Sequence, residues 1–330
     1  MSHSTQADSA AANDLPINLP SFFGMLLRGM GQVMFQNSAH AGFLFTLGIA
    51  ANDWRMALAA LVGTCSSTLS AMALGAERNL LRSGMYGFNG ALVAIAMLTF
   101  LEGNAVTWAC LIVAAACSSL VMAAMLAAFE AWKLPVLTAP FVLICLCVFL
   151  ASARFGYLQP AGILFAAAPP HTADMEGMVT ATTLFRGSFM GLAQVFFQGS
   201  VATGVLFFSG LLVASPRACV VALLASLVGA LVAWSMGTPE VAIHGGVYGF
   251  NSVLVAIALA TVFLPKTTAS LAYALAGAAI TPFAAAALAA ALEPLGLPAM
   301  TLPFVLVTWL LLLAARRLSA IPSSGLAPTA

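Results

Sequence analysis

Charged side chains are scarce in this chain: 11 Lys and Arg and 10 Asp and Glu residues make up 6% of its 330 positions. A soluble protein of this length needs many more charged groups to cover its surface, whereas a bilayer interior removes that need. Apolar residues account for 62%, and the mean hydropathy is +1.05. The composition therefore predicts an all-α polytopic membrane protein. The net charge of +1 gives no reason to expect a nucleic-acid partner.

Groups that could support catalysis or bind a metal are also sparse. None of the six cysteines lies in a C-x-x-C pair, and a helix would point the thiols of Cys145 and Cys147 in different directions. We interpret the cysteines as buried apolar fillers. The sequence shows no acid–base or metal constellation, so we expect neither an enzyme nor a cofactor. The cysteines are Cys65, Cys110, Cys117, Cys145, Cys147 and Cys219.

Three motifs occur twice, about 162 residues apart. Residues 31–48 match 193–210 at nine of eighteen positions, 84–96 match 246–258 at ten of thirteen, and 134–144 match 297–307 at seven of eleven. Such a repeat in an apolar chain is typical of a pseudosymmetric transporter whose pathway lies between its halves. The shared residues include Gln, Phe, Asn, Thr and Pro but no acid or base, which favours a neutral, polar and planar solute.

Each half divides into six apolar segments at Pro, Gly and charge clusters. The segments run roughly over 20–36, 38–51, 56–75, 85–100, 105–130 and 135–152, and then over 178–197, 199–213, 217–236, 247–263, 268–292 and 298–315. A full crossing needs about 20 residues. We therefore expect five crossings and one half-span per half, with the Gln motif in the half-span. An odd number of crossings inverts the second half relative to the first.

The halves are expected to pack as one transmembrane domain over residues 19–317. Within it, repeat 1 covers about 20–155 and repeat 2 about 178–317. Residues 1–18 are polar and small, which predicts a disordered cytoplasmic tail, and 318–330 form a similar C-terminal tail.

Loop charges predict the orientation. With ten crossings and a cytoplasmic N-terminus, seven basic residues fall inside and two outside, as the positive-inside rule requires. The inside residues are Arg78, Arg82, Lys133, Arg217, Lys266, Arg316 and Arg317, and the outside residues are Arg55 and Arg154. Both termini are therefore expected in the cytoplasm.

The first motif, Q-V-x-F-Q, begins at Gln32 and again at Gln194. A primary amide in lipid would leave hydrogen-bonding groups unpaired, so these side chains are expected to face protein or a wet cavity. Gln32 and Phe35 are three residues apart, and on a helix they would share one face. Alternatively, each Gln only joins two helices. The recurrence of amide and ring in both halves favours a site.

The second motif, Y-G-F-N, follows glycine and predicts a helix start at which Asn binds loop backbone. Phe88 and Leu92 are four residues apart, as are Phe250 and Leu254, so each pair would line one stripe of a helix. Ordinary core packing is the alternative. A functional site additionally requires Phe88 to face Phe35 across a slot.

The third motif, L-P-x-x-T-x-P-F, contains two prolines five residues apart. They break regular helix and leave backbone carbonyls without N–H partners. In a membrane such carbonyls are tolerated only against protein or water, so they are natural acceptors along a pathway. Thr138 and Thr301 lie between the prolines of each copy. The alternative is a pair of proline kinks in which each Thr bonds to its own helix.

Together, these doubled motifs resemble those of the urea transporter family, across residues 20 to 317. We expect a bacterial member of that family. The resemblance implies ten transmembrane helices and two half-spans in two inverted repeats. It also implies a homotrimer with one pore per protomer, surrounded by membrane lipid in the cell inner membrane.

The resemblance implies site residues as well. In that family, phenylalanines enclose the flat urea molecule while a row of oxygens accepts its N–H groups. Carried over by position, the urea-binding residues are Gln32, Val33, Phe35, Phe88 and Leu92 in the first repeat, and Gln194, Val195, Phe197, Phe250 and Leu254 in the second. Thr138 and Thr301 would flank the central constriction.

The expected function is therefore passive, channel-like diffusion of urea. A channel for other small neutral solutes, such as short amides, water or ammonia, stays open because the same slot would pass them. A membrane-embedded enzyme and gradient-coupled transport are further alternatives. Both require charged or metal-binding groups near the midplane, and the three motifs contain none.

Overall fold

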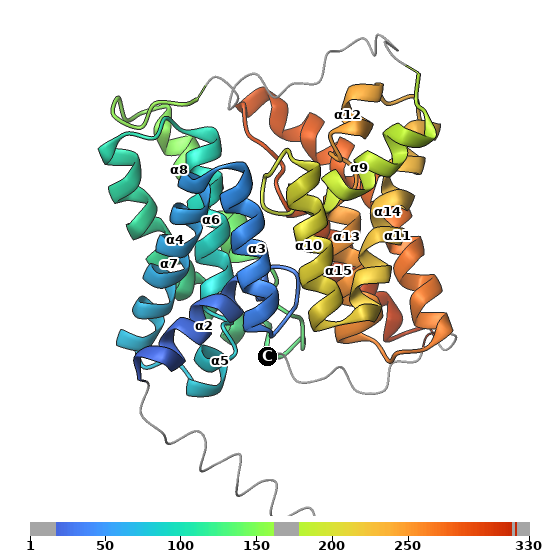
Figure 1. The fold of residues 1–330 in the computed structure, drawn as a ribbon. Coiled ribbons are helices and arrows are strands. Elements are labelled where there is room, and N and C mark those ends of the chain that lie inside the picture. Colours follow the sequence, from blue (N-terminus) through green and yellow to red (C-terminus); the bar gives the residue numbers. More distant parts are fainter. Residues whose placement is uncertain (1–17, 162–177, 319–320, 322–330) are drawn as a thin grey trace, which may run out of the picture.

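The computed structural model describes residues 18–161, 178–318 and 321, and its elements in these ranges are helices (Figure 1). The first half contains α2 (Leu19–Gln32), α3 (Ala39–Asn52), α4 (Trp54–Ala73), α5 (Arg78–Arg82), α6 (Gly87–Phe100), α7 (Ala105–Phe129) and α8 (Ala139–Ser152). The second contains α9 (Ala181–Gln194), α10 (Val201–Ala214), α11 (Pro216–Ser235), α12 (Glu240–His244), α13 (Phe250–Ile257), η1 (Ala258–Phe263), α14 (Thr268–Leu292), η2 (Glu293–Leu295) and α15 (Leu302–Ala315). The all-α prediction is confirmed.

Polar N-caps start the same four helices in each half. In each case the side-chain oxygen of the residue before the helix accepts a hydrogen bond from a backbone N–H of the first turn, which would otherwise lack a partner. These caps are Asn18, Ser38, Asp53 and Asn104, and their counterparts are Thr180, Ser200, Ser215 and Thr267. All of these caps except Ser38 and Ser200 lie outside the three repeated stretches, so the repeat extends beyond them.

The helix lengths repeat as well. α2 and α9 have 14 residues each, α3 and α10 14, α4 and α11 20, α5 and α12 5, α7 and α14 25, and α8 and α15 14. In Figure 1, α2 and α5 lie at the bottom of one half, whereas α9 and α12 lie at the top of the other. This is the arrangement that inverted repeats would give.

One π-helical segment, η1, absorbs a one-residue insertion in the second half. The offset between equivalent residues is 162 before it, as for Phe88 and Phe250, and 163 after it, as for Leu101 and Leu264. π-helical turns are the usual way in which a helix accommodates an extra residue, and they are frequent at functional sites. As a result, Phe263 at the end of η1 is the structural counterpart of Phe100.

In the part of the chain that the structure describes, four helices are long and apolar enough to cross a membrane: α4, α7, α11 and α14. Helices of 14 residues, such as α3 and α8, extend only about 21 Å, which is less than the hydrocarbon core of about 30 Å. Helix length and composition confirm a multi-pass membrane protein. α8 starts at Ala139 rather than at 135, because the chain around Pro135 is not helical. The sequence did not predict α5 and α12.

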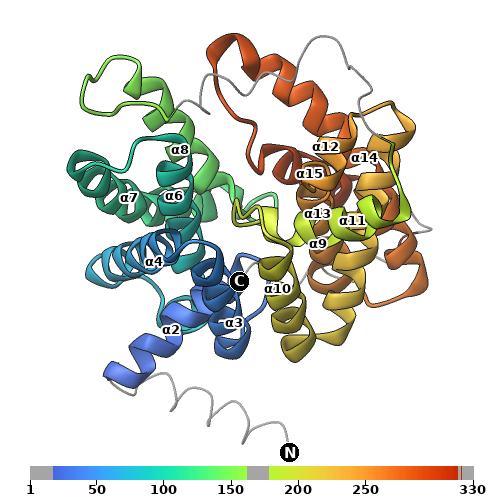
Figure 2. The same ribbon diagram turned by 45° about the horizontal axis from the view of Figure 1, so that its top comes forward.

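The halves meet where α3 packs against α10, as both ribbon views show (Figure 2). Gly48 and Gly210 permit this close approach: an added Cβ would lie 2.9 Å from the ring of Phe207 or 2.7 Å from that of Phe45, respectively. The two phenylalanine rings are fully buried, with centroids 5.1 Å apart. The core of the molecule therefore includes the boundary between the repeats.

Candidate functional site

The first motif folds into a tight turn after α2 rather than continuing as helix. The helix ends at Gln32, and Phe35 adopts a left-handed backbone with φ of 60°. The N–H of Gln36 donates to the carbonyl of Gly31 at 3.0 Å, which closes the turn as in a Schellman motif. The prediction that Gln32 and Phe35 share one helical face is therefore wrong. The left-handed turn, and not helical periodicity, sets the direction of the ring.

Left-handed non-glycine residues coincide with the repeated motifs. The described residues include five, of which Phe35 and Phe197 form one equivalent pair and Leu137 and Met300 a second, with φ between 50° and 60°. Each such residue costs about 1–3 kcal/mol, and such strain clusters at ligand-binding sites. The fifth, Lys133, lies just before the third motif. The strain therefore points to the first and third motifs as the functional region.

Asn89 connects the second motif to the third. Its Nδ2 donates to the carbonyl of Leu137 at 3.4 Å, and its Oδ1 accepts the N–H of Phe141 at 3.1 Å. The latter N–H lies in the first turn of α8, where no helical acceptor exists, so Asn89 caps α8 from a neighbouring helix. The prediction that this Asn binds loop backbone is confirmed, and the buried amide stabilises the bent segment.

Asn251 does the same in the second half. Its Nδ2 donates to the carbonyl of Met300 at 3.2 Å, and its Oδ1 accepts the N–H of Phe304 at 3.3 Å. Both asparagines are buried. The two bent segments are therefore held in the same conformation.

The bent segments bring the two threonines into contact across the boundary between the halves. The hydroxyl oxygens of Thr138 and Thr301 lie 2.6 Å apart and share one hydrogen bond. The residues are 3% and 1% exposed. Each Thr therefore bonds to the other half, and the alternative in which each bonds to its own helix is wrong.

Aromatic rings cross the same boundary in both directions. The Phe35 ring lies edge-to-face against Phe263 and Phe304 of the second half, with centroids 6.1 and 6.0 Å apart. By symmetry, Phe197 of the second half lies against first-half rings. Those contacts are with Phe100 at 5.8 Å and Phe141 at 6.2 Å. The phenylalanine in each left-handed turn therefore packs against rings of the opposite half.

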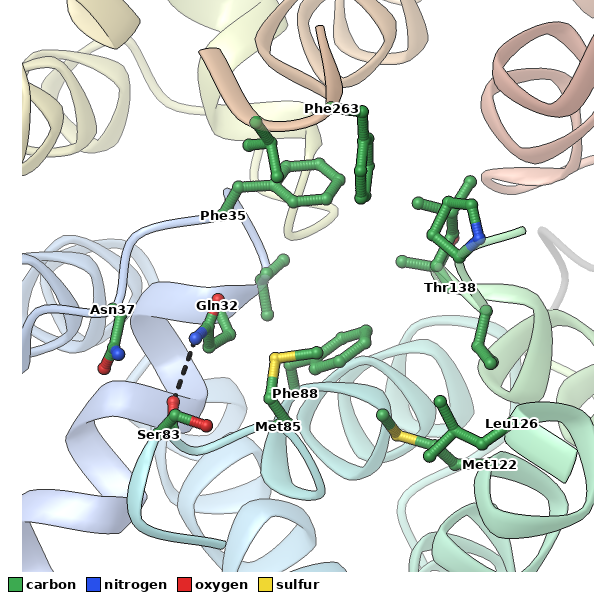
Figure 3. A pocket seen from close by; sticks show the side chains of 15 residues that line it. Gln32, Phe35, Asn37, Ser83, Met85, Phe88, Met122, Leu126, Thr138 and Phe263 are labelled. Atoms are coloured by element: carbon green, nitrogen blue, oxygen red, sulfur yellow. Dashed lines mark hydrogen bonds between the residues drawn. The ribbon is translucent and has the colours of Figure 1, made fainter. Parts of the chain in front are cut away.

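A cavity of about 270 Å³ opens beside the Phe35 turn (Figure 3). Figure 3 shows Phe35 and Phe88 on opposite sides of it, with Thr138 at a third side. None of the lining side chains is charged. They are Gln32, Val33, Phe35, Asn37, Ser83, Met85, Phe88, Met122, Leu126, Pro135, Val136, Leu137, Thr138, Val262 and Phe263. Residues predicted from all three first-half motifs therefore line one cavity.

The Gln side chains connect adjacent elements at this position. The Nε2 of Gln32 donates to the carbonyl of Ser83 at 2.9 Å, and that of Gln194 donates to the carbonyl of Gly245 at 3.1 Å. In Figure 3 the amide oxygen of Gln32 points away from Ser83. The amide nitrogen therefore has a structural bond, and the oxygen is left as an acceptor on a cavity-lining residue.

The predicted second-half residues do not gather around one cavity as the first-half residues do. A cavity of about 210 Å³ includes Phe250 in its lining but neither Gln194 nor Phe197. The remaining predicted residues are buried and line neither of these two cavities. They are Leu92, Val195, Leu254 and Thr301.

Two pairs of equivalent phenylalanines in this region were not among the residues predicted from the sequence. Phe141 and Phe304 belong to the third motif, so their recurrence was a signal. Phe100 and Phe263 gave no such signal because η1 shifts their alignment by one residue.

The repeated helix lengths and caps, the apolar helices and the uncharged cavity define an all-α, multi-pass membrane protein built from two similar halves. A family model for the urea transporter matches residues 23–316, and the chain belongs to that family. It is 30% identical over 304 residues to urea transporter 1 of Rattus norvegicus, across 91% of this chain and 78% of that protein. It is also 30% identical over 295 residues to urea transporter 1 of Ovis aries, across 88% and 77% respectively.

Proposed function

We propose that the protein is a passive, channel-like transporter that lets urea diffuse across the membrane between its two halves. The observation that carries this proposal is the uncharged cavity, with Phe35 and Phe88 on opposite sides and the Thr138–Thr301 pair close by. Membership of the urea transporter family supports urea as the solute.

The chemistry of urea fits such a lining. Urea is flat and carries four N–H donors in one plane, so a row of acceptors can replace its water shell step by step. Aromatic faces on either side leave room for a planar solute and exclude bulky ones. A lining without charges leaves ions with their full dehydration cost, so ions are rejected.

Each repeat contributes one binding position in this proposal. The first uses the amide oxygen of Gln32 with the Phe35 and Phe88 rings, and the second uses Gln194, Phe197 and Phe250. The hydroxyls of Thr138 and Thr301 form the central constriction. Val33, Leu92, Val195 and Leu254 complete the apolar walls.

The orientation in the membrane follows from the loop charges. Arg316 donates to the carbonyl of Lys133 at 2.8 Å, and Arg217 to that of Lys266 at 3.4 Å. Residues assigned to the cytoplasmic side are therefore neighbours, which supports both termini in the cytoplasm. We further propose a location in the cell inner membrane and a homotrimer in which every protomer has its own pore.

Urea uptake into proteoliposomes tests the function directly. Isotope-labelled urea should enter vesicles that contain the protein much faster than protein-free vesicles, and collapse of a proton or sodium gradient should leave the rate unchanged. Entry no faster than in protein-free vesicles would refute the proposal. Uptake of acetamide or formamide at the urea rate would favour a general channel for small neutral solutes.

A further inference from the structure

The two phenylalanine turns differ in how firmly they are attached to the opposite half. At the end of α3, the Nδ2 of Asn52 donates to the Oε1 of Gln198, at 2.9 Å. Gln198 directly follows Phe197 in the second turn. In the first turn the equivalent residue is Gln36, and the counterpart of Asn52 is Ala214, which has no donor. Among the described residues, this side-chain hydrogen bond between the halves is present at the second turn and absent at the first.

A second bond repeats the same asymmetry. The hydroxyl of Thr203, just after the second turn, donates to the carbonyl of Gly48 in α3 at 2.8 Å. The counterpart of Thr203 is Ala41, and that of Gly48 is Gly210. Alanine has no hydroxyl, so the first turn lacks this bond as well. The Asn52–Gln198 and Thr203–Gly48 bonds both connect the second turn and the helix after it to α3.

Apolar packing differs in the same direction. Phe196 precedes Phe197 and packs against the rings of Phe45 and Phe207, with centroids 5.9 and 5.0 Å apart. In the first turn the equivalent residue is Met34, whose unbranched side chain adapts its conformation more readily. The second turn is therefore in contact with α3 through both polar and aromatic groups.

The polar contacts of the first turn are internal to it. The N–H of Ser38 donates to the carbonyl of Gln36 at 2.8 Å, and the Nε2 of Gln36 to the carbonyl of Met34 at 2.7 Å. The second turn also has the latter bond, from Gln198 to Phe196 at 2.7 Å. Neither contact connects the first turn to the other half. The 270 Å³ cavity beside Phe35 also leaves that turn more room to move.

We propose that Asn52 is a positioning residue that, through Gln198, holds Phe197 in place and makes the second aromatic position the stricter of the two selectivity steps. This inference rests on the proposed urea pathway. A ring can exclude a slightly larger solute only if it does not move aside, and a strained left-handed turn needs outside contacts to stay fixed. The Phe35 position then adapts to the solute, whereas the Phe197 position selects it.

The test compares permeabilities of N-methylurea and urea in the same proteoliposomes, so that loss of folded protein cancels from the ratio. Asn52→Ala should raise the ratio about two- to tenfold, the factor that corresponds to one net hydrogen bond. Thr203→Ala removes the other bond to α3 and should also raise the permeability ratio of N-methylurea to urea. It replaces Asn52→Ala as the test variant if Asn52→Ala does not fold. Ser209→Ala is the control, because that exposed hydroxyl bonds only within α10.

A compensating variant tests the mechanism. Ala214→Asn offers Gln36 the missing donor, so adding it to Asn52→Ala should return the ratio to within about twofold of the wild type, the lower limit for one bond. An unchanged ratio in Asn52→Ala, an equal rise in Ser209→Ala, or failure of the double variant to restore selectivity would overturn the inference. Absence of wild-type urea flux would instead refute the proposed function.

Discussion

Replacement of both Thr138 and Thr301 by Val probes the constriction with little change of shape. In the wild type the two buried hydroxyls bond to each other at 2.6 Å. Removal of both partners of a buried hydrogen bond is nearly neutral for stability, whereas removal of one leaves the other unpaired at about 1–3 kcal/mol. The double variant should therefore be more stable than either single variant in thermal unfolding.

Urea flux should respond in the opposite way, with the largest loss in the double variant. A urea N–H that has shed water at the constriction would find no hydroxyl acceptor, at a penalty of about 1–3 kcal/mol. At 1.36 kcal/mol per factor of ten, this slows permeation by about five- to 150-fold. Stopped-flow light scattering of proteoliposomes under a urea gradient measures the rate.

The matched control is Thr281→Val. Thr281 is also fully buried, but its hydroxyl donates to the carbonyl of Gly277 in its own helix. Urea flux through the Thr281→Val variant should match that of the wild type. Wild-type flux in the double variant at Thr138 and Thr301 would show that this pair is structural and does not accept urea N–H groups at a constriction.

Two further predictions concern stability and pH. Asn89→Leu deprives two buried backbone groups of their partner and should lower the free energy of unfolding by about 2–6 kcal/mol. The control, Asn79→Ala at the exposed surface, should change the free energy of unfolding by about 0.5 kcal/mol or less. Equal thermal stability of both variants would refute the capping role of Asn89. Urea flux should be the same at pH 6 and pH 8, because no titratable side chain lines the 270 Å³ cavity beside Phe35, and a change greater than about twofold, or about 0.4 kcal/mol in the barrier, would contradict an uncharged lining at that position.

Much of the fold was predictable because the repeat and the apolar segments are encoded locally. The segment predicted at 105–130 appears as α7, Ala105–Phe129, and the segment at 268–292 coincides with α14. The short helices α5 and α12 were missed, since five residues carry no periodicity. The one-residue insertion in η1 was also missed, because it lies between two motifs that each align well on their own.

Recurring residues of the first half line the cavity, as the sequence suggested, but their geometry could not be predicted. The recurrence of Phe35 and Phe197 identified the rings, but helical spacing gave the wrong backbone. The left-handed turn depends on tertiary contacts that override local preference. The asymmetry between Asn52 and Ala214 was likewise invisible, because it concerns a contact between halves and not a motif.

In the proposed function, urea passes between the two halves beside the phenylalanine turns. A crystal structure with a selenium-containing urea analogue tests this most directly, since anomalous scattering locates the solute. We expect a peak between the rings of Phe35 and Phe88, near the amide oxygen of Gln32. A peak found only at the lipid-facing surface, or only between subunits of an oligomer, would contradict it.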